Sequence, residues 1–417
     1  MAIPSDSPAP ILDRKVVLVS HALPPTASVL TQVICQLFHG LSDHPYCLIR
    51  SGEPVSTSHG VDAPCTLGPT TLEIGRSPLW RDRSSRIGRL VELGMVPTAS
   101  SAVRSLARSI ADITSREGCR TIVSFSGDLL NLPAASLACS KTGADFVPIL
   151  LDDYVFQWRR PFKRRLAERW ARQMFSPGQT VIVPNEFLAD ALADRYPVNP
   201  AVVRNPCHLP PPPSAPPTLP VDQQGEIAIA FTGSIYSAHY DSFRNLLRAL
   251  GQPPAHPTRL HLYSNQTPDD LKQVGLDGPI VHHGFVANLE IPLILRQAHI
   301  LYLGLAFDAP NPEIVRTASP GKMGDYFASG TPVLVHAPED SFVSWYCRTH
   351  GCGLVVDQPN PNQLADAIRR LSTDTSLRQR LSENAYQRAR QDFALPDVRQ
   401  RLIAAIESNV PAAGARS

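Results

Sequence analysis

The chain alternates short apolar runs of strand length with segments in which apolar residues recur at helical spacing. Helical spacing is clearest at 29–41 and 103–113, then at 243–250, 289–298, 322–329 and 363–371. The strand-length runs fall at 15–20, 46–50, 120–125, 145–151, 180–183 and 201–203, then at 226–231, 259–263, 279–281, 300–303, 332–336 and 353–356. Strands that alternate with helices predict parallel sheets covered by helices on both faces. At 52–97 the periodicity is weak, and there we expect only loops around a strand or a short helix.

The distribution of proline predicts where the chain divides. Eight prolines lie within 206–220, and such a segment favours an extended, semi-rigid connector. We therefore expect an α/β protein with two facing Rossmann-like domains, 1–205 and 226–395, and a linker at 206–225. Residues 396–417 are expected to form a helix and tail that pack back on the first domain. Such domains leave a cleft between them, and ligands bind at the strand ends that face it.

Composition excludes several classes of protein. The chain has 417 residues, with 39 Lys and Arg against 37 Asp and Glu, which argues against a dedicated nucleic-acid binder. Apolar residues make up 43% of the chain and exclude wholesale disorder. No apolar run approaches the roughly 20 residues of a membrane span, and no secretory signal is expected at the N-terminus. The eight cysteines include no C-x-x-C pair, so we expect a reduced, cytoplasmic protein without a structural metal.

The turn after the predicted strand at 226–231 is the first candidate site. It contains Gly233 and Ser234 and precedes a predicted helix. Glycine permits close backbone approach, and amides near the start of a helix favour an anion. An ordinary strand–helix turn is the alternative. The chain has neither G-x-G-x-x-G nor a P-loop motif here, which argues against a dinucleotide enzyme and a P-loop ATPase.

The second candidate site is the segment that leads into the predicted helix at 322–329. Ser319 is expected to cap this helix, Pro320 to begin it and Gly330 to end it. Loop amides, the helix dipole and the Lys322 ammonium would together hold a diphosphate, and Asp325 would accept hydrogen bonds from a ribose diol. The alternative is a capped surface helix that carries a Lys–Asp pair.

Taken together, these segments resemble glycosyltransferase family four, a group of retaining enzymes with the GT-B fold. The resemblance covers most of 121–393. It rests on FTGSI at 231–235, HGFV at 283–286, SPGKMGDYFASGTP at 319–332, CGLVV at 352–356, VPNEF at 183–187 and VRNP at 203–206.

The resemblance implies a donor domain for a nucleotide-diphosphate sugar in the second half and an acceptor domain in the first. It implies that Asp325 holds the ribose from the second acidic position of the family's E-x7-E motif. Phe285 and Val286 would face the base. The implied donor-binding residues are Gly233, Ser234, Phe285, Val286, Ser319, Gly321, Lys322 and Asp325.

Two features of the family pattern are missing. Thr317 stands where the family has its first Glu, and Glu313 would replace that carboxylate only if the loop folds back. The Arg and Lys that usually follow the first donor-domain turn are also absent. Lys322 is then the remaining cation, with His239 or Arg244 as candidate helpers.

Acidic and hydroxyl side chains after strands of the first half are candidates for the acceptor side. Asp128 and the adjacent pair Asp152 and Asp153 each follow a predicted strand. A carboxylate in this position can orient an acceptor hydroxyl or accept its proton, and a helix cap is the alternative. Thr26 and Ser28 follow the first strand and would contact acceptor or phosphate, or else cap the next helix.

The segment 158–175 predicts a cationic amphipathic helix. Seven basic residues and one acid lie between Arg159 and Arg172, while Phe162 and Leu166 begin an apolar face at four-residue spacing. Such a helix can lie on an anionic membrane surface. The alternative is that its apolar face docks on the protein's own sheet and its basic face is solvated.

The sequence therefore predicts a metal-independent, hexosyltransferase-like glycosyltransferase with Asp153 and Lys322 as catalytic residues and no cofactor besides its sugar-nucleotide substrate. Transfer would retain the anomeric configuration and serve polysaccharide or glycoconjugate assembly on a glycan, lipid-linked or small-molecule acceptor. The expected location is cytoplasmic, or peripheral on the inner face of the membrane if the basic helix binds lipid. A two-domain nucleotide-sugar epimerase and a non-catalytic sugar-nucleotide binding homologue remain alternatives.

Overall fold

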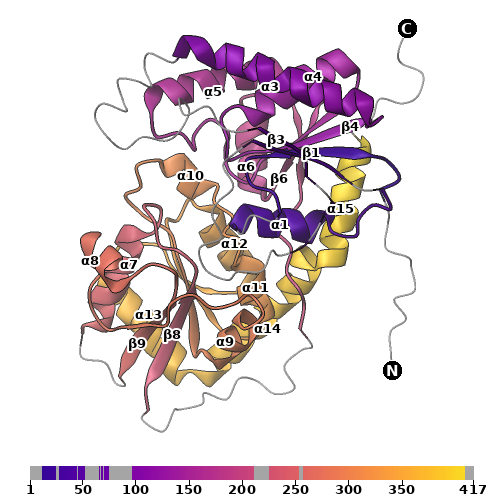
Figure 1. Cartoon of the computed structure of the whole chain (residues 1–417). Coiled ribbons are helices and arrows are strands. Elements are labelled where there is room, and N and C mark those ends of the chain that lie inside the picture. The colour runs from indigo at the N-terminus through magenta and orange to yellow at the C-terminus, as the bar shows by residue number, and fades with distance from the viewer. Residues whose placement is uncertain are drawn as a thin grey trace, which may run out of the picture. The chain divides into compact units, whose positions relative to one another are not determined.

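Figure 1 presents the computed structural model of the chain, which describes residues 12–24, 28–44, 46–51, 65, 67–68, 70–74, 96–210, 225–252 and 257–408. The chain forms two compact units, one of Met1–Arg204 with Leu395–Ser417 and the other of Asn205–Ala394. Most of the expected linker, 211–224, and the tail 409–417 lie outside the described residues, as does Thr26.

The first unit is built on a parallel sheet that has seven strands in the described part of the chain, in the order β3-β2-β1-β4-β5-β6-β7. The central strands are buried along their whole length, as their near-continuous apolar sequences require in a parallel sheet. The strands are β1 (Val16–Ser20), β2 (Cys47–Ser51), β3 (Thr70–Ile74), β4 (Thr121–Phe125), β5 (Asp145–Ile149), β6 (Thr180–Val183) and β7 (Asn199–Val202).

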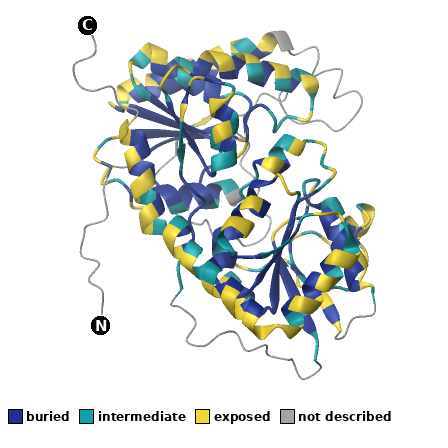
Figure 2. Ribbon diagram, turned by 180° about the vertical axis from the view of Figure 1, so that it is seen from behind, coloured by how far each residue is buried: buried dark blue, intermediate teal, exposed yellow. Residues whose placement is uncertain are grey.

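Helices cover both faces of this sheet. One face packs on α3 (Val96–Arg116), α4 (Asn131–Thr142), α5 (Pro161–Met174) and α6 (Glu186–Ala193). The other packs on α1 (Val29–Phe38) and on α15 (Leu395–Ser408), the last described helix of the chain. In Figure 2 the strands are dark blue between helices whose outer sides are exposed.

The second unit repeats this plan with a parallel sheet of six strands among the described residues, in the order β10-β9-β8-β11-β12-β13. Its strands are β8 (Ile227–Thr232), β9 (Thr258–Tyr263), β10 (Ile280–His282), β11 (Ile300–Gly304), β12 (Val333–His336) and β13 (Leu354–Val356). Its helices are α7 (Tyr240–Leu250), α8 (Pro268–Gln273), α9 (Ile291–Gln297), α10 (Pro312–Arg316), α11 (Met323–Ala328), α12 (Phe342–His350), α13 (Pro361–Thr373), α14 (Thr375–Arg388) and the π-helix η2 (Ala389–Phe393).

The prediction of an α/β fold with two Rossmann-like domains is confirmed. Every predicted strand is present within one or two residues, and β3 lies in 52–97, where only loops around a strand or a short helix were predicted. Gly330 follows α11 with φ 81°, as expected for a glycine that ends a helix. Helix α4 had no sequence prediction because it is rich in Ala and Ser and has only a weak apolar stripe.

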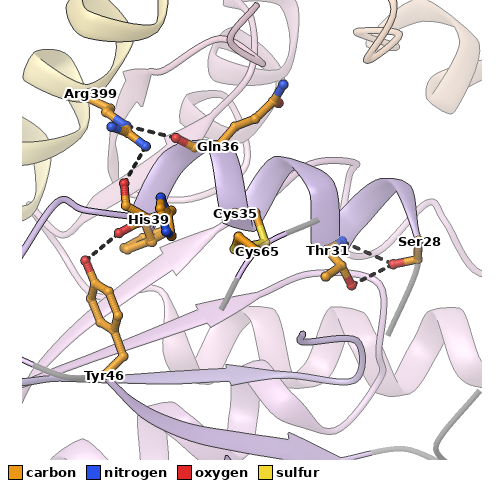
Figure 3. The surroundings of a disulfide bond; sticks show 9 residues. Ser28, Thr31, Cys35, Gln36, His39, Tyr46, Cys65 and Arg399 are labelled. Carbon is orange, nitrogen blue, oxygen red and sulfur yellow. Dashed lines mark hydrogen bonds between the residues drawn. A yellow bond between two sulfur atoms is a disulfide. The ribbon is translucent and has the colours of Figure 1, made fainter. Parts of the chain in front are cut away.

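One expectation about cysteine is wrong, because Cys35 and Cys65 form a disulfide (Figure 3). Cys35 lies on α1, and Cys65 packs against the same apolar cluster as α1, close in sequence to the buried Leu67. The spacing of the two cysteines, 30 residues apart, carried no recognisable pairing motif. A structural disulfide is typical of an oxidising compartment, so cysteine usage no longer favours a reducing one.

The basic helix α5 docks on its own sheet. Leu166, Trp170 and Met174 are buried in the core of the first unit, and the predicted apolar face is therefore covered. The exposed side carries basic residues, including Arg165 and Arg169. Within the described residues, no helix combines the length and apolarity that a membrane span needs.

Candidate active site

The candidate donor site lies where strand order reverses in the second sheet. From β8 the chain builds β9 and β10 on one side, then crosses to β11 on the other, and open α/β sheets bind ligands at such a point. Gly233 follows β8 there with φ 105°, a conformation that favours glycine. Its N–H donates to the carbonyl of Tyr263 at 2.8 Å, which fixes the turn against the end of β9.

Lys322 reaches this turn from the segment before α11. Its Nζ lies 3.5 Å from the centroid of the Phe231 ring, and a Cβ added to Gly233 would lie 3.3 Å from the same atom. Within the described chain the ammonium has no carboxylate partner. Burial lowers the pKa of Lys322 to about 7. A desolvated cation without a counter-charge is an attractive site for an anionic ligand.

Backbone amides surround the same position. The N–H groups of Ser319, Gly321 and Lys322 have no hydrogen-bond partner among the described residues, and neither does that of Ser234. The Ser234 hydroxyl is exposed and donates to Asn265 at 3.3 Å. Unpaired amides beside an ammonium group form a suitable seat for phosphate oxygens.

The helix that follows begins later than predicted. Helix α11 starts at Met323 with Lys322 as its N-cap, and no side chain caps it. The carbonyl of Pro320 accepts from Met323 at 2.9 Å in a turn before the helix, so Pro320 is not its first residue. Ser319 does not act as the cap, and its carbonyl accepts from the Asn205 side chain at 3.1 Å. That bond and the turn keep the segment out of the helix and leave its amides free.

Asp325 lies in the first turn of α11 and is partly buried. Burial raises the pKa of the Asp325 side chain to about 7, and its carboxylate has no hydrogen bond within the described chain. It forms no ion pair with Lys322 in the part of the chain that the structure describes, so the alternative of a surface Lys–Asp pair is wrong. A carboxylate without a partner is available to accept hydrogen bonds from a ligand.

The two candidate helpers of Lys322 are not free cations. Burial, followed by the charge of Lys322, lowers the pKa of His239 to about 3, so this buried imidazole is neutral near pH 7. Arg244 donates to the carbonyl of Val274 at 2.7 Å and lies over the ring of Tyr240. Its guanidinium therefore supports the loop after α8.

Thr317, which stands in place of the family's first Glu, is the C-cap of α10, and its candidate substitute Glu313 lies in the first turn of that helix. The Thr317 hydroxyl is buried and donates to the carbonyl of Glu313 at 2.9 Å, and its N–H also bonds that carbonyl. Thr317 therefore closes the last turn of α10, which favours a structural role. The Glu313 side chain is partly buried.

The predicted base-facing strip follows β10, two strands away from β8 in the sheet. Phe285 follows β10 and is 55% exposed, which is unusual for a large aromatic side chain, while Val286 is partly buried. The ring of Tyr263, whose carbonyl holds the Gly233 turn, stacks on His283 with 4.4 Å between centroids. The strip is thus connected to the turn through neighbouring strand ends.

The carboxylates predicted for the acceptor side have local partners in the first unit. Asp153 is buried, pairs with Arg195 and accepts from the backbone N–H groups of Val155 and Phe156. Both of its oxygens are thus engaged, which favours a structural role over that of a base. Asp152 is exposed beside it.

The remaining acceptor-side candidates lie at helix starts. Asp128 is buried and accepts from the N–H groups of Leu130, the N-cap residue of α4, and of Asn131 at 2.7 and 3.1 Å, so its carboxylate satisfies amides at the start of the helix. Ser28 is the N-cap of α1 and accepts from Thr31 N–H at 3.1 Å (Figure 3). For both residues the geometry is that of the helix-cap alternative.

Comparison with known proteins found a family model that matches part of the chain. Residues 226–374 match the family model "Glycosyl transferases group 1". The match lies within the second unit and includes Gly233, Phe285, Lys322 and Asp325. The finer resemblance to family four stays a prediction. A search of curated proteins by sequence found no match.

Solved structures of similar fold cover nearly the whole chain. Anabaena Alr3699/HepE in complex with UDP and glucose has a TM-score of 0.61 at 15% identity, over 95% of this chain and 100% of that one. Sucrose-phosphate synthase from Thermosynechococcus elongatus has 0.64 at 12%, over 93% and 97%. A putative UDP-N-acetylglucosamine 2-epimerase from Listeria monocytogenes has 0.52 at 11%, over 95% and 96%. At such identities the likeness establishes the GT-B fold alone, and that fold serves more than one reaction.

Three contacts at the site had no sequence indication. Phe231, the aromatic partner of Lys322, is indistinguishable in sequence from a core residue of β8. The hydroxyl of Tyr326 accepts from Thr232 N–H at 3.0 Å and joins α11 to the end of β8. Asn205 holds Ser319 across 114 positions of the chain, a separation at which no local pattern exists.

If the turn after β8 holds a nucleotide, replacing Gly233 by alanine should weaken its binding. The new Cβ would lie 3.3 Å from Lys322 Nζ, and the positive φ would be strained, at about 1 kcal/mol or more. We expect affinity for UDP to fall severalfold by calorimetry. Gly178→Ala is the matched control, because Gly178 has φ 75° but no atom within 4 Å of the added Cβ. Equal loss of UDP affinity in both variants would contradict the assignment.

Proposed function

We propose that the protein is a glycosyltransferase that takes its sugar from a nucleotide-diphosphate sugar bound by the second unit. The main support is the desolvated Lys322 ammonium, which lies without a carboxylate partner in the described chain beside unpaired amides at the switch point of a GT-B donor sheet. The family match over 226–374 supports the transferase class.

In this proposal each part of the site has one task. Lys322 and the amides of Ser319, Gly321 and Ser234 hold the diphosphate and stabilise its charge as it leaves. Asp325 accepts hydrogen bonds from the ribose diol, and Phe285 with Val286 lies against the base. The binding of UDP by Anabaena HepE supports a nucleotide-sugar donor of the same kind.

The finer features of the reaction belong to the same proposal. Since both oxygens of Asp153 are engaged, the departing diphosphate is the better acceptor for the proton of the attacking hydroxyl, which agrees with front-side transfer and retention. Charge neutralisation by Lys322 supports a reaction without a metal ion, and activity should then survive a chelator. A role in polysaccharide or glycoconjugate assembly is carried over from the family resemblance alone.

Incubation with labelled nucleotide sugars tests the function directly. A transferase releases free nucleotide slowly in water and faster with an acceptor. Isomerised sugar on intact nucleotide would instead identify an epimerase, and binding without turnover a non-catalytic homologue. A thermal-shift screen of nucleoside diphosphates should come first, to identify the nucleotide of the donor. A nucleotide that binds selectively raises the apparent stability of the folded protein.

Nucleotide affinity should depend on pH through Lys322. In the free protein its pKa is about 7, and a bound diphosphate must raise it. Binding then takes up protons above pH 7, so affinity for UDP falls as pH rises from about 7. The Lys322→Arg variant keeps a permanent charge, so its UDP affinity should not show the fall with pH that deprotonation of Lys322 causes. Any pH dependence that comes from Asp325 should persist in both the wild type and the variant. Calorimetry across pH distinguishes the two, and identical profiles would contradict the role of Lys322.

Association with a membrane surface is a separate proposal. Because the apolar face of α5 is covered, it would depend on the exposed basic side that includes Arg165 and Arg169. Such binding is electrostatic, so it should require anionic lipid and disappear at high salt. Flotation with anionic vesicles measures this.

A further inference from the structure

Two free cysteines of the first unit are in contact with each other. The Sγ atoms of Cys47 and Cys119 lie 3.5 Å apart, with no bond between them. The same unit carries the Cys35–Cys65 disulfide. Cys47 belongs to the core cluster that α3 and α4 cover, whereas Cys65 packs against the cluster on the other face of the sheet. The contact between Cys47 and Cys119 is therefore independent of the existing disulfide.

The fold brings these two sulfur atoms together at the edge where the strands begin. Cys47 is the first residue of β2, and Cys119 precedes β4 by two residues, on the other side of β1. The N–H of Cys119 donates to the Thr114 carbonyl at 2.9 Å. The next N–H, that of Arg120, donates to the Lys15 carbonyl at 3.4 Å. The end of α3 and the residue before β1 thus hold Cys119 in place beside Cys47.

The pair lies just below the surface of the first unit. Cys47 and Cys119 are each 7% exposed. Both chain neighbours of Cys119, Gly118 and Arg120, are exposed. Small local openings are frequent at the ends of secondary-structure elements, so a small oxidant can reach these thiols in the folded protein.

The other free cysteines have either a sulfur contact or some exposure, but not both. Cys347 and Cys352 of the second unit form a side-chain hydrogen bond, yet both are 0% exposed. Cys139 of α4 is 8% exposed but has no sulfur partner among the described residues. Cys207 is 1% exposed. Contact and exposure therefore coincide at the pair in the first unit.

We propose that Cys47 and Cys119 form a modification site at which a hydroperoxide closes a second disulfide in the first unit. One thiolate attacks hydrogen peroxide, so the O–O bond breaks, a sulfenic acid forms and hydroxide leaves. The other thiolate attacks the sulfenic sulfur, forms the S–S bond and releases a second hydroxide. The two thiol protons convert both hydroxides to water. The thiols lose two electrons in all, and the peroxide gains them.

The new bond would connect β2 to the start of β4 across β1. Its ends are 72 residues apart in the chain, so in the chain-entropy account it restricts the unfolded state. The oxidised first unit should therefore unfold at a higher urea concentration than the reduced one. This effect does not depend on the proposed function, because it concerns the first unit and no nucleotide.

The rate of closure should depend on the protonation of the thiols. The hydrogen bond with Cys47, followed by burial, raises the pKa of Cys119 well above its ordinary value. The nearby charges act in opposite directions, since Lys15 lowers this pKa and Glu117 raises it. Because the thiolate is the reactive form, closure should be slow at neutral pH and faster in alkaline solution.

Peptide mapping of the full chain tests the site. The protein is treated with hydrogen peroxide, then with catalase, alkylated with N-ethylmaleimide in denaturant and digested without a reductant. We expect a peptide that links Cys47 to Cys119, so that the six free thiols of the described chain fall to four. Cys347 and Cys352 should both be recovered in alkylated form.

Two variants separate the pair from a single reactive thiol. In Cys119→Ser the oxidation of Cys47 should stop at the sulfenic acid, which dimedone traps. Cys139→Ser is the matched control, because it removes another free thiol of the first unit and should leave the new link intact. In a Cys35→Ser, Cys65→Ser background, dithiothreitol should reverse the rise in the urea midpoint, since only the new bond is present there.

Each outcome decides the proposal. It is overturned if Cys47 and Cys119 of the peroxide-treated wild type are recovered alkylated, or if dimedone traps them there in place of the link. A Cys347–Cys352 link of equal yield would also overturn it, because thiols that are fully buried would then be reacting from the unfolded chain. Should circular dichroism find Cys119→Ser unfolded, the maps of the wild type and of Cys139→Ser decide.

Discussion

Lys322→Ala should lower turnover by more than tenfold. The ammonium group lies 3.5 Å from the Phe231 centroid beside unpaired amides, where a leaving diphosphate gains negative charge. A charge-assisted hydrogen bond in such a site contributes about 1.5–3 kcal/mol, and 1.4 kcal/mol is a factor of ten in rate. If the interaction strengthens as the diphosphate leaves, kcat should fall more than affinity for UDP. Steady-state kinetics with the donor found in the screen measure both.

This loss should occur without a loss of stability. The pKa of Lys322 falls from 10.5 in the ordinary side chain to about 7 in the folded protein, so folding disfavours its charged form. Between about pH 7 and 10.5 the unfolded chain binds more protons, and the stability of the wild type therefore rises with pH across this window. Lys322→Ala should lack that rise and melt no earlier than the wild type at pH 7.

Two controls accompany the experiment. Lys272→Ala removes an exposed lysine from α8 of the same unit and should leave turnover unchanged. Lys322→Arg keeps the charge and should recover part of the rate if charge matters more than the shape of the ammonium group. Near-normal turnover in Lys322→Ala would remove the basis for the donor site.

The sequence predicted the two-domain fold well because the fold depends on local patterns. Strands such as Val16–Ser20 are short, apolar and β-branched, and the alternation with helical periodicity is enough to specify parallel sheets. The turn at Gly233 and the segment at Lys322 could be proposed as a site from the sequence, because a glycine after a strand and the run Ser-Pro-Gly-Lys at 319–322 have local meanings.

What the sequence could not predict depends on distant contacts. The carboxylate of Asp153 looked catalytic in the chain, but Arg195, 42 residues away, pairs with it. Ser319 looked like a cap, but Asn205, 114 positions earlier in the chain, donates to its carbonyl. Helix α11 begins later than predicted for the same reason, because the bond from Asn205 to Ser319 helps to keep the preceding segment out of the helix.

Removing the disulfide should lower the stability of the first unit by about 3–4 kcal/mol. Cys35 and Cys65 close a loop with a sequence separation of 30, and in the chain-entropy account a cross-link of this size restricts the unfolded state by that amount. Cys35→Ser should therefore shift the urea midpoint of the first unit downward. Amide hydrogen exchange in β1, β2 and β4 reports that unit separately, while β8 and β11 report the other.

The position of the bond explains why its loss should stay local. Helix α1 is also held by Arg399 of α15, which donates to the carbonyls of Gln36 and His39 at 2.9 and 2.6 Å (Figure 3). Tyr46 adds a hydrogen bond to the Phe38 carbonyl at 2.9 Å. The helix should thus remain folded in the variant, and the segment around Leu67 should lose the most protection. Reductant should destabilise the wild type to the same level and leave a Cys35→Ser, Cys65→Ser double variant unchanged. Equal stability of the oxidised and reduced wild type would mean that the cross-link does not restrict the unfolded chain.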